Sequence, residues 1–302
     1  MIGTTFGRYV IESKIGEGGM GVVYRGRDIK LQRLVALKLL NRRMLASPTA
    51  YGWLLREAQI ASSLNHPAIC TIYDVGEEED QPYIAMEYIQ GQPLSALVKP
   101  TGIPAGAVCR YGCRIADALG HAHERGVIHR DIKSSNMLIS DGGSLKVLDF
   151  GLAKRLRGQS IERITTSRSS LAEIGALAGT LPYQAPEILR GERADVRSDL
   201  WSLGVVLFEM ATGTPPFCGH TVFELSAKIM IDEPAAFPRG VPGYLAQVIK
   251  RCLHKNPVSR YACARDVAKG LGMRCQSVSL FGTANLETAG RPKAFAVGGA
   301  AN

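Results

Sequence analysis

The sequence predicts an α+β protein with two lobes, a small antiparallel β-sheet with one helix followed by a larger, mainly helical lobe. Short β-branched runs dominate the first part of the chain, and helical spacing of apolar residues dominates from Pro104 to Leu271. Between them lies a connection that contains Gly and Pro and begins at Glu87. A chain of 302 residues is close to the size at which one core divides into two. We expect an N-terminal lobe at 1–88, a C-terminal lobe at 89–273, and a flexible tail or linker at 274–302, where Gly, Ala, Ser and Thr dominate.

Composition narrows the classes of protein and of partner. The formal net charge of +9 would suit a polyanionic partner, but the basic residues are dispersed, which favours a solvated surface around a nucleotide site and no nucleic acid. Seven Cys with no C-x-x-C pair indicate a reducing, cytoplasmic setting without a disulfide framework. The N-terminus lacks a signal-peptide pattern. The most apolar stretch, Leu200 to Ala211, is shorter than the ~20 residues that span a bilayer, so we expect no membrane segment in this chain.

A glycine-rich pattern follows the first predicted strand, which begins at Tyr9. Gly16, Gly18 and Gly21 match G-x-G-x-x-G, which in a dinucleotide-binding turn opens into a helix. Here the next residues, Val22-Val23-Tyr24, favour a second strand, so the glycines are expected in a hairpin loop. Backbone N–H groups of such a loop can contact phosphate oxygens. A flexible turn without a ligand is the alternative.

A lysine interrupts the next apolar strand, Leu34 to Leu40. Lys38 there is costly to bury unless it has a partner, although a surface lysine on an edge strand is the alternative. Ser47-Pro48 then predicts a helix start, and Glu57 lies within the apolar stripe of that helix. We therefore predict an ion pair between Lys38 and Glu57, with Lys38 also reaching nucleotide phosphates.

The remaining elements follow from periodicity and stop signals. Strands near Ile69–Val75 and Tyr83–Met86 complete the small sheet, and a helix from Pro104 to Arg125 ends at Gly126. The later helices are expected at Leu200–Ala211, Thr221–Ile231 and Tyr244–Leu253, and the last helix is expected within the stretch from Asn256-Pro257 to Leu271.

The stretch from Val127 to Gly151 contains a predicted hairpin. Two short apolar runs, Met137 to Ile139 and Leu145 to Leu148, flank Asp141-Gly142-Gly143, which is a turn signal. The hairpin would fix the distance between the polar loop before it and the Asp-Phe-Gly after it.

Polar residues on either side of that hairpin suit phosphate chemistry. Asn136 and Asp149 offer hard oxygen ligands, which suit Mg²⁺ because this ion binds few side chains together with substrate phosphates. Asp131 is then left as a candidate general base.

Taken in order, these motifs resemble those of the eukaryotic-type protein Ser/Thr kinases, a family also found in bacteria. Each motif alone is weak, but the ordered set is specific and covers most of the chain from Tyr9 to Leu271. The matching stretches are Gly16–Val23, Val35–Lys38, Glu57, His129–Asn136, Asp149–Gly151, Ala185–Glu187, Asp199–Gly204 and Arg260.

The resemblance implies a bilobal protein-kinase-like fold that uses ATP with Mg²⁺, or with Mn²⁺ in its place. Asp131 would orient the substrate hydroxyl and accept its proton, and Asn136 and Asp149 would hold the metal ions. Lys38 would hold the α- and β-phosphates and would be positioned by Glu57. Lys133 would contact the transferred phosphate, and its position marks Ser/Thr specificity. Thr180 would hydrogen-bond Asp131 and Lys133, which completes the set of catalytic residues.

The resemblance also implies an ATP pocket under the glycine-rich loop. The base would lie between Val23, Ala36 and Leu138, with Met86 behind it. Its full set of contacts would be Ile15, Gly16, Glu17, Gly18, Gly19, Met20, Gly21, Val23, Ala36, Lys38, Met86, Glu87, Tyr88 and Leu138, with Glu87 and Tyr88 in the connection between lobes.

Other matched residues are expected to be structural or regulatory. His129 would support the catalytic loop, Asp199 would hold the backbone of that loop, and Glu187 would form a buried ion pair with Arg260. The segment between Gly151 and Ala185 would be the activation loop. Its phosphosite candidates are Thr165, Thr166, Ser169 and Ser170, and a phosphate there would pair with Arg130; a polar loop without regulatory use is the alternative.

The predicted function is a protein Ser/Thr kinase that transfers the γ-phosphate of ATP to protein hydroxyls and autophosphorylates its activation loop, in trans if it forms a homodimer. A nucleotide-binding scaffold without transfer and a small-molecule kinase are the alternatives. The stretch Gly179 to Tyr183 resembles the family's peptide-docking segment and favours protein substrates.

Overall fold

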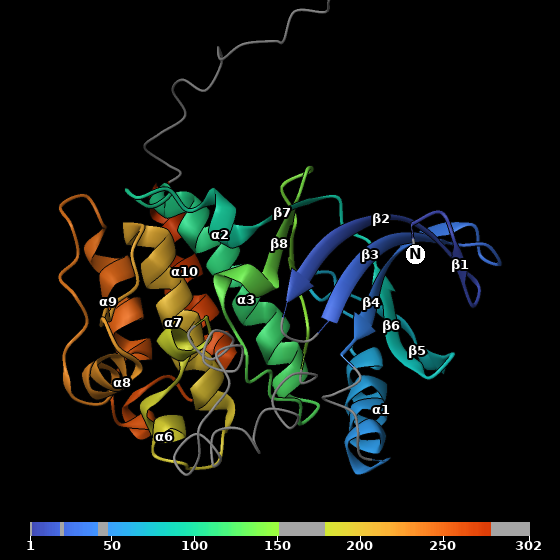
Figure 1. Ribbon diagram of the computed structural model, residues 1–302. Helices are drawn as coiled ribbons and strands as arrows, with labels where there is room; N and C mark the ends of the chain where they lie inside the picture. Colours follow the sequence, from blue (N-terminus) through green and yellow to red (C-terminus); the bar gives the residue numbers. More distant parts are fainter. Residues whose placement is uncertain (1, 19–20, 42–47, 151–178, 279–302) are drawn as a thin grey trace, which may run out of the picture.

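The computed structural model describes residues 2–18, 21–41, 48–150 and 179–278. These residues form two unequal parts, a curled sheet with one helix and a larger body of helices (Figure 1). The predicted α+β class with a small sheet followed by a larger helical part is therefore confirmed.

The sheet of the small lobe has six antiparallel strands in the order β1-β2-β3-β4-β6-β5. β2 and β3 form the predicted glycine-rich hairpin, in which Gly18 lies opposite Gly21. The strands are β1 (Thr5–Phe6), β2 (Tyr9–Gly18), β3 (Gly21–Asp28), β4 (Arg33–Leu40), β5 (Ile72–Glu78) and β6 (Gln81–Glu87).

Close packing of β3 on β4 explains why glycine is required at position 21. Gly21 has a φ of +141°, and a Cβ there would lie 1.9 Å from the carbonyl oxygen of Leu39. No side chain fits at that distance, so only glycine can begin β3 this close to the backbone of β4.

Strand β4 separates two apolar clusters, one on each face of the sheet. Leu37 belongs to one cluster and Ala36 to the other, so the alternation of side chains places Ala36 and Lys38 on the same face. Helix α1 (Pro48–Ser62) begins where Ser47-Pro48 predicted. The small lobe thus presents Lys38 on the same face as the cluster that contains Ala36 and Met86.

The larger lobe is built around α7 (Val196–Thr212), whose residues are nearly all buried. α3 (Ala105–His123) packs against α7 and α10, and Gly126 follows it with a φ of +73°, which confirms the predicted stop. The other helices are α2 (Leu94–Leu97), η2 (Ser134–Asn136), η3 (Leu181–Tyr183), α6 (Pro186–Leu189), α8 (Val222–Ile231), α9 (Gly243–Cys252), η4 (Pro257–Ser259) and α10 (Ala264–Val278).

The last helix extends further than the sequence indicated. α10 continues to Val278, so residues 274–278 are helical although they were assigned to the tail. No Gly or Pro occurs among these residues to end the helix. Residues 279–302 lie outside the described residues. Within the described ranges, no helix has the length and apolar character needed to cross a bilayer.

A second, three-stranded sheet joins the lobes. β7 (Gly91–Pro93), β8 (Met137–Ser140) and β9 (Leu145–Val147) are ordered β7-β8-β9. Val147 donates its N–H to the carbonyl of Ala68 at 2.8 Å and accepts from the N–H of Cys70 at 2.9 Å. The hairpin that positions the polar loop is therefore attached directly to the chain entering β5.

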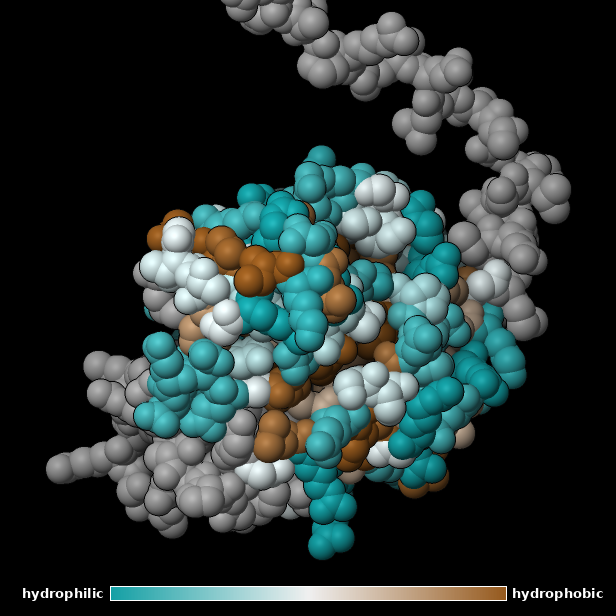
Figure 2. Space-filling view, turned by 90° about the vertical axis from the view of Figure 1, so that its right-hand side faces the viewer, coloured by the Kyte–Doolittle hydropathy of each residue, from teal (hydrophilic) through white to brown (hydrophobic). Residues whose placement is uncertain are grey.

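The outer face of the small lobe carries mixed side chains. Seen from that side, hydrophilic residues dominate and hydrophobic patches interrupt them (Figure 2). Ile2, Ile29 and Leu31 are among the large apolar side chains exposed in this lobe.

Candidate active site

The β8–β9 hairpin places the polar residues on either side of it. Met137 pairs with Val147 and Ile139 with Leu145, as the sequence predicted. Asn136 ends the 3-10 turn before β8, and Asp149 follows two residues after β9. The N–H of Leu148 donates to the carbonyl of Asn136 at 2.9 Å, so the two ends of the hairpin are held together.

Asp131 is buried, with 7% of its surface exposed, and its carboxylate is only half satisfied. Asn136 Nδ2 donates to Asp131 Oδ2 at 3.0 Å and to its main-chain oxygen at 2.8 Å, and Lys133 Nζ lies 3.0 Å from Oδ2. Oδ1 of Asp131 is buried and has no hydrogen-bond partner among the described residues. A buried acceptor in this state is suited to receive a hydroxyl proton.

Lys133 connects this carboxylate to the segment at 179–183. Its Nζ donates to Thr180 Oγ1 at 3.1 Å, while it also forms the ion pair with Asp131. Thr180 is buried. Of the two hydrogen bonds expected of Thr180, the one with Lys133 is therefore present, and Lys133 links Thr180 to Asp131.

A buried aspartate on α7 holds the backbone of the loop. Asp199 accepts the N–H groups of His129 and Arg130, each at 2.8 Å, and a hydrogen bond from His123 at 2.9 Å. Burial by itself raises the pKa of Asp199, but the hydrogen bond and charge of His123 hold that pKa below its usual value. These bonds stabilise Arg130 at a φ of +66° and confirm the structural role predicted for Asp199.

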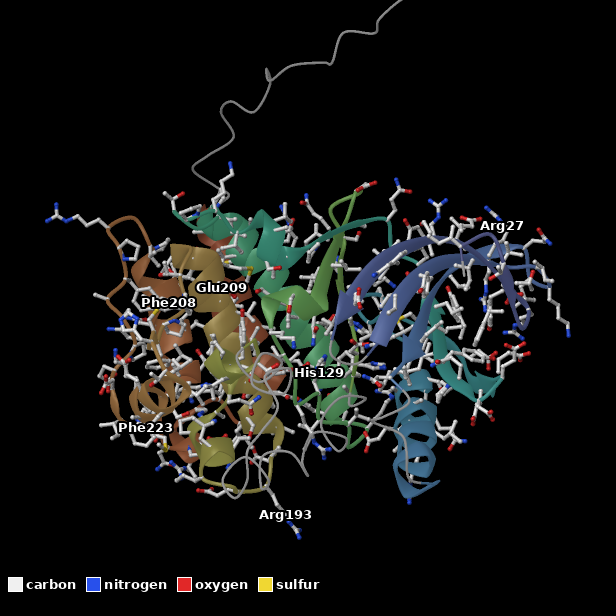
Figure 3. The ribbon with its side chains drawn as sticks, in the orientation of Figure 1. Arg27, His129, Arg193, Phe208, Glu209 and Phe223 are labelled. Carbon is white, nitrogen blue, oxygen red and sulfur yellow. The ribbon has the colours of Figure 1, made fainter. Side chains whose placement is uncertain are left out.

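His129 lies between the two lobes (Figure 3) and supports the loop as predicted. Its Nδ1 accepts the N–H of Asp131 at 3.2 Å, so Nε2 is the donor to the carbonyl of Leu148 at 2.8 Å. Its ring packs on the buried ring of Phe150, with centroids 4.5 Å apart. Both ring nitrogens are occupied, which leaves His129 a packing residue.

The predicted ion pair between Lys38 and Glu57 is not formed. Lys38 Nζ instead bonds Asp149 Oδ2 at 2.7 Å, and no ion pair links it to Glu57 among the described residues. Glu57 is half-buried on α1. The reason is position: Asp149, which has a φ of +56°, turns its carboxylate to Lys38, and that one bond already compensates the buried charge.

Asp149 is held in its ionised form. Burial by itself raises the pKa of this carboxyl, but the charge of Lys38 and its hydrogen bond, with His129 and Lys133 nearby, hold the pKa below its usual value. An ionised carboxylate is an oxygen ligand that suits a hard divalent cation. The described residues contain no group of three or more His, Cys, Asp or Glu arranged to hold a metal.

Residues assigned to the base pocket gather in part. Val23, Ala36, Met86 and Tyr88 belong to one apolar cluster beneath the sheet. Leu138 is half-buried on β8 and is not part of that cluster, while Ile15 is exposed. Of the other predicted ATP contacts, Gly19 and Met20 lie outside the described residues. So do the phosphosite candidates Thr165, Thr166, Ser169 and Ser170.

Glu87, which is predicted to contact the base, also forms side-chain interactions that the sequence did not reveal. Its carboxylate pairs with Lys146 Nζ at 2.8 Å and accepts the N–H of Thr71 at 3.2 Å. Lys146 also reaches the carbonyl of Ile69 at 3.3 Å. The side chain of Glu87 therefore anchors the connection between lobes to β9.

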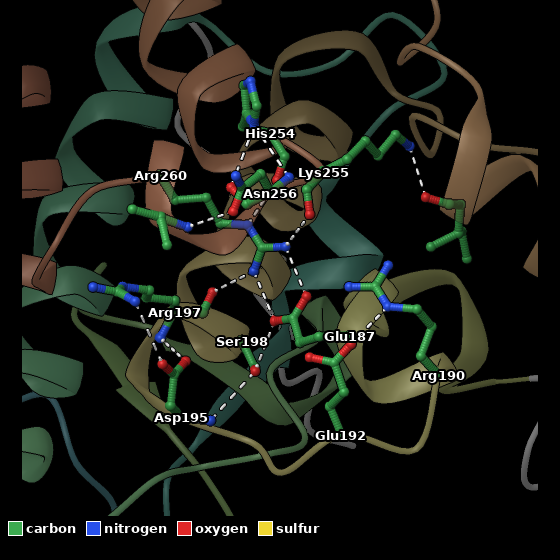
Figure 4. Close-up of polar contacts among 12 residues, drawn as sticks. Glu187, Arg190, Glu192, Asp195, Arg197, Ser198, His254, Lys255, Asn256 and Arg260 are labelled. Carbon is green, nitrogen blue, oxygen red and sulfur yellow. Dashed lines mark hydrogen bonds and ion pairs between the residues drawn. The ribbon is translucent and has the colours of Figure 1, made fainter.

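The predicted ion pair between Glu187 and Arg260 is confirmed and fully buried (Figure 4). Two parallel hydrogen bonds of 2.7 and 2.8 Å join the groups, and Ser198 Oγ donates to Glu187 at 2.8 Å. Burial raises the pKa of Glu187, but Arg260 more than offsets this and lowers it.

This fold and this arrangement of residues define a protein kinase domain. The chain belongs to the protein kinase family, because residues 9–269 match the protein kinase domain. It is 38% identical to the serine/threonine-protein kinase PknB of Mycobacterium tuberculosis over 273 residues, which cover 87% of this chain and 42% of that protein.

Two further comparisons agree. A probable serine/threonine-protein kinase of Clostridium perfringens is 36% identical over 273 residues, 88% of this chain and 38% of that protein. A crystal structure of the Mycobacterium tuberculosis PknI kinase domain matches with a TM-score of 0.71 and 27% identity, covering 91% of this chain and 99% of that chain. The chain spans about two fifths of the length of the curated relatives it matches.

Proposed function

We propose that this chain is an active protein Ser/Thr kinase that transfers the γ-phosphate of ATP to seryl and threonyl hydroxyls of proteins. The observation that carries the proposal is the buried carboxylate of Asp131, whose Oδ1 has no partner among the described residues while Lys133 and Asn136 hold Oδ2. A substrate hydroxyl at Oδ1 would be oriented for attack and would lose its proton there.

The charged groups around Asp131 fit a metal-bound triphosphate. Asp149 and Asn136 would supply protein oxygens for Mg²⁺, with Mn²⁺ as a substitute, and nucleotide phosphates would complete the coordination. The ion would neutralise phosphate charge during transfer. Lys38 would hold the α- and β-phosphates, and Lys133 would contact the γ-phosphate and the acceptor. In that state α1 would bring Glu57 to Lys38, replacing the present bond to Asp149.

The adenine base would pack against the cluster that contains Val23, Ala36 and Met86, and Leu138 would contact the base from the opposite side. Main-chain groups of Glu87 and Tyr88 would hydrogen-bond the edge of the adenine base. The side chain of Glu87 would not take part, because it is paired with Lys146. The glycine-rich loop from Ile15 through Gly21 would cover the phosphates, with Glu17 on its outer side.

Regulation is proposed to act through the segment before Gly179. Phosphorylation at Thr165, Thr166, Ser169 or Ser170 would place charge near Arg130. We place this reaction in the cytoplasm and in trans between two copies of the chain.

The decisive experiment is incubation of the purified chain with γ-labelled ATP, Mg²⁺ and a generic basic protein, followed by phosphoamino-acid analysis. We expect label on phosphoserine and phosphothreonine, lost when Mg²⁺ is chelated. A scaffold would bind ATP and give no label, and a small-molecule kinase would leave the protein unlabelled. Either result would contradict the proposal. Arg27→Ala, on the outer part of the sheet, is a matched control that should transfer like the wild type.

A further inference from the structure

Two arginines on β3 share one carboxylate on β2. Arg25 Nε donates to Glu12 Oε2 at 2.8 Å, and Arg27 Nε donates to Glu12 Oε1 at 3.1 Å. All three side chains are partly exposed, so these pairs by themselves contribute little to stability. The two arginines nevertheless differ in what else they contact.

The strand register places Arg25 beside the predicted base pocket. Arg25 lies directly opposite Ala36 on β4, and Ala36 lies opposite Met86 on β6. Residues directly opposite one another in antiparallel strands point to the same face of a sheet. Arg25 is therefore on the face that carries the cluster of Ala36 and Met86, two residues along β3 from Val23, which packs on the same cluster.

An irregularity in β2 brings Glu12 to Arg25. Ile11 pairs with Gly26 on β3. The next pair is Ser13 with Arg25, so Glu12 is an extra residue in β2. A bulge of this kind re-aims the side chain of the extra residue. The carboxylate of Glu12 consequently lies where it accepts the guanidinium of Arg25.

Arg25 also contacts the connection between the lobes. Its guanidinium carbon lies 6.0 Å from the centroid of the Tyr88 ring, which is within reach of a cation–π interaction. Tyr88, which can accept a hydrogen bond from the guanidinium, and Glu12 together raise the pKa of Arg25, so the group stays charged in this contact. The half-buried ring of Tyr88 packs at the same time on the apolar cluster beneath the sheet. Arg27, on the outer part of the sheet (Figure 3), has no contact with an aromatic ring among the described residues.

The contact joins the glycine-rich hairpin to a residue whose main chain would bind the edge of the base. Tyr88 is the first residue after β6, and Arg25 lies on the strand that leaves the hairpin. With its ring held by both Arg25 and the cluster, Tyr88 keeps its main-chain groups in one direction before the nucleotide arrives. Such preorganisation lowers the free-energy cost of binding.

We propose that Arg25 is a positioning residue for the base of the nucleotide, acting through the ring of Tyr88, and that Glu12 holds Arg25 in place. The inference rests on the proposed kinase function, which supplies ATP as the ligand. It concerns only the base end of that ligand. Loss of the contact should therefore weaken the binding of ATP and of adenosine, which has no phosphates, by the same factor. The rate of transfer at saturating ATP should not change.

The test compares Arg25→Met with Arg27→Met. Each variant removes one cation and one hydrogen bond from Glu12, so the changes in net charge and in thermal stability should match. Arg25→Met alone also releases Tyr88. In this variant we expect the Kd for ATP and the Kd for adenosine to rise about threefold, the scale of an exposed cation–π contact. Both constants, measured by titration calorimetry, should stay at wild-type values in Arg27→Met, and steady-state transfer by Arg25→Met should show a raised KM for ATP with kcat unchanged.

A Tyr88→Leu background tests the route of the effect. Arg25→Met should add no further loss there, because the ring through which Arg25 acts is gone. Another threefold loss would contradict the role of Tyr88. The proposal is overturned if Arg25→Met binds adenosine as tightly as Arg27→Met does, or if ATP binding alone is weakened, since the guanidinium would then act on the phosphates. Failure of the kinase function is separate, because a wild type that binds ATP and labels no protein would still give both Kd values.

Discussion

Two ion pairs in this protein have the same shortest N–O distance but differ in how completely their hydrogen-bonding groups are used. Lys38 and Asp149 are 2.7 Å apart, as are Arg260 and Glu187. The five N–H donors of Arg260 are all used, two on Glu187 and the others on the carbonyls of His254, Arg197 and Lys255. Within the described part of the chain, Lys38 makes a single side-chain hydrogen bond, and Asp149 keeps 19% of its side chain exposed.

The difference indicates what each pair does. A fully satisfied, bidentate pair has no capacity for a ligand and stabilises the chain around it. An incompletely satisfied pair beside the buried Asp131 retains donors and oxygens that a phosphate and a cation can use. The first should matter for folding and the second for transfer, and the predictions below test this division.

The largest effect is expected from breaking the complete pair. Arg260→Met leaves Glu187 buried without a cation and should lower the free energy of unfolding by about 3–5 kcal/mol. Denaturant unfolding at fixed pH measures it. Adding Glu187→Leu to the Arg260→Met variant removes the unpaired carboxylate and should recover part of the lost stability. A loss below about 1 kcal/mol in Arg260→Met would contradict the structural role.

Breaking the incomplete pair should act on catalysis. Lys38→Met removes a cation expected to contact phosphates, and transfer should fall by about 10²–10³-fold. Stability should change far less than in Arg260→Met, because Asp149 retains access to water. Steady-state transfer and thermal unfolding of the two variants give the comparison. A Lys38→Met protein that transfers normally would end the assignment of Lys38.

Acid should weaken the complete pair, with a smaller effect on stability than the Arg260→Met substitution. The pKa of Glu187 is lowered in the folded protein from its ordinary value of 4.5. Its contribution to stability is therefore fully present above pH 4.5 and is lost as pH falls through the lowered pKa. Urea unfolding from pH 7 downward should show this decline in the wild type and a shallower one in Glu187→Gln. Identical slopes would refute it.

The smallest effect is expected at the connection between lobes. Lys146→Met frees Glu87 from β9 and should raise KM for ATP by up to about fivefold, since a partly exposed ion pair contributes about 1 kcal/mol. Lys269→Met, which breaks an exposed pair with Asp266, is the control and should change nothing. An unchanged KM in Lys146→Met would show that the anchor is irrelevant to the nucleotide.

Local signals in the sequence predicted much of the fold. The hairpin around Asp141-Gly142-Gly143, the helix start at Pro48 and the stop at Gly126 were all identified because turns and caps depend on a few neighbouring residues. The pairing of Glu187 with Arg260 was expected from the resemblance to the kinase family, because these two residues match positions that the family uses for structure.

What the sequence could not fix depends on how separate elements pack. Lys38 had two carboxylates available, and only the placement of α1 and of Asp149 decides between them. Nothing in the sequence distinguished Lys146 from the other lysines, because its contact with Glu87 depends on where β9 packs.

The most direct measurement is single-turnover transfer from γ-labelled ATP by Asp131→Asn, together with the affinity of that variant for ATP. Replacing the carboxylate removes the group that would accept the hydroxyl proton and keeps its shape. The structure predicts that transfer to a basic protein falls by about 10²–10⁴-fold with ATP affinity unchanged. Equal incorporation of label by Asp131→Asn and the wild type would contradict the assignment on which the proposed kinase function rests.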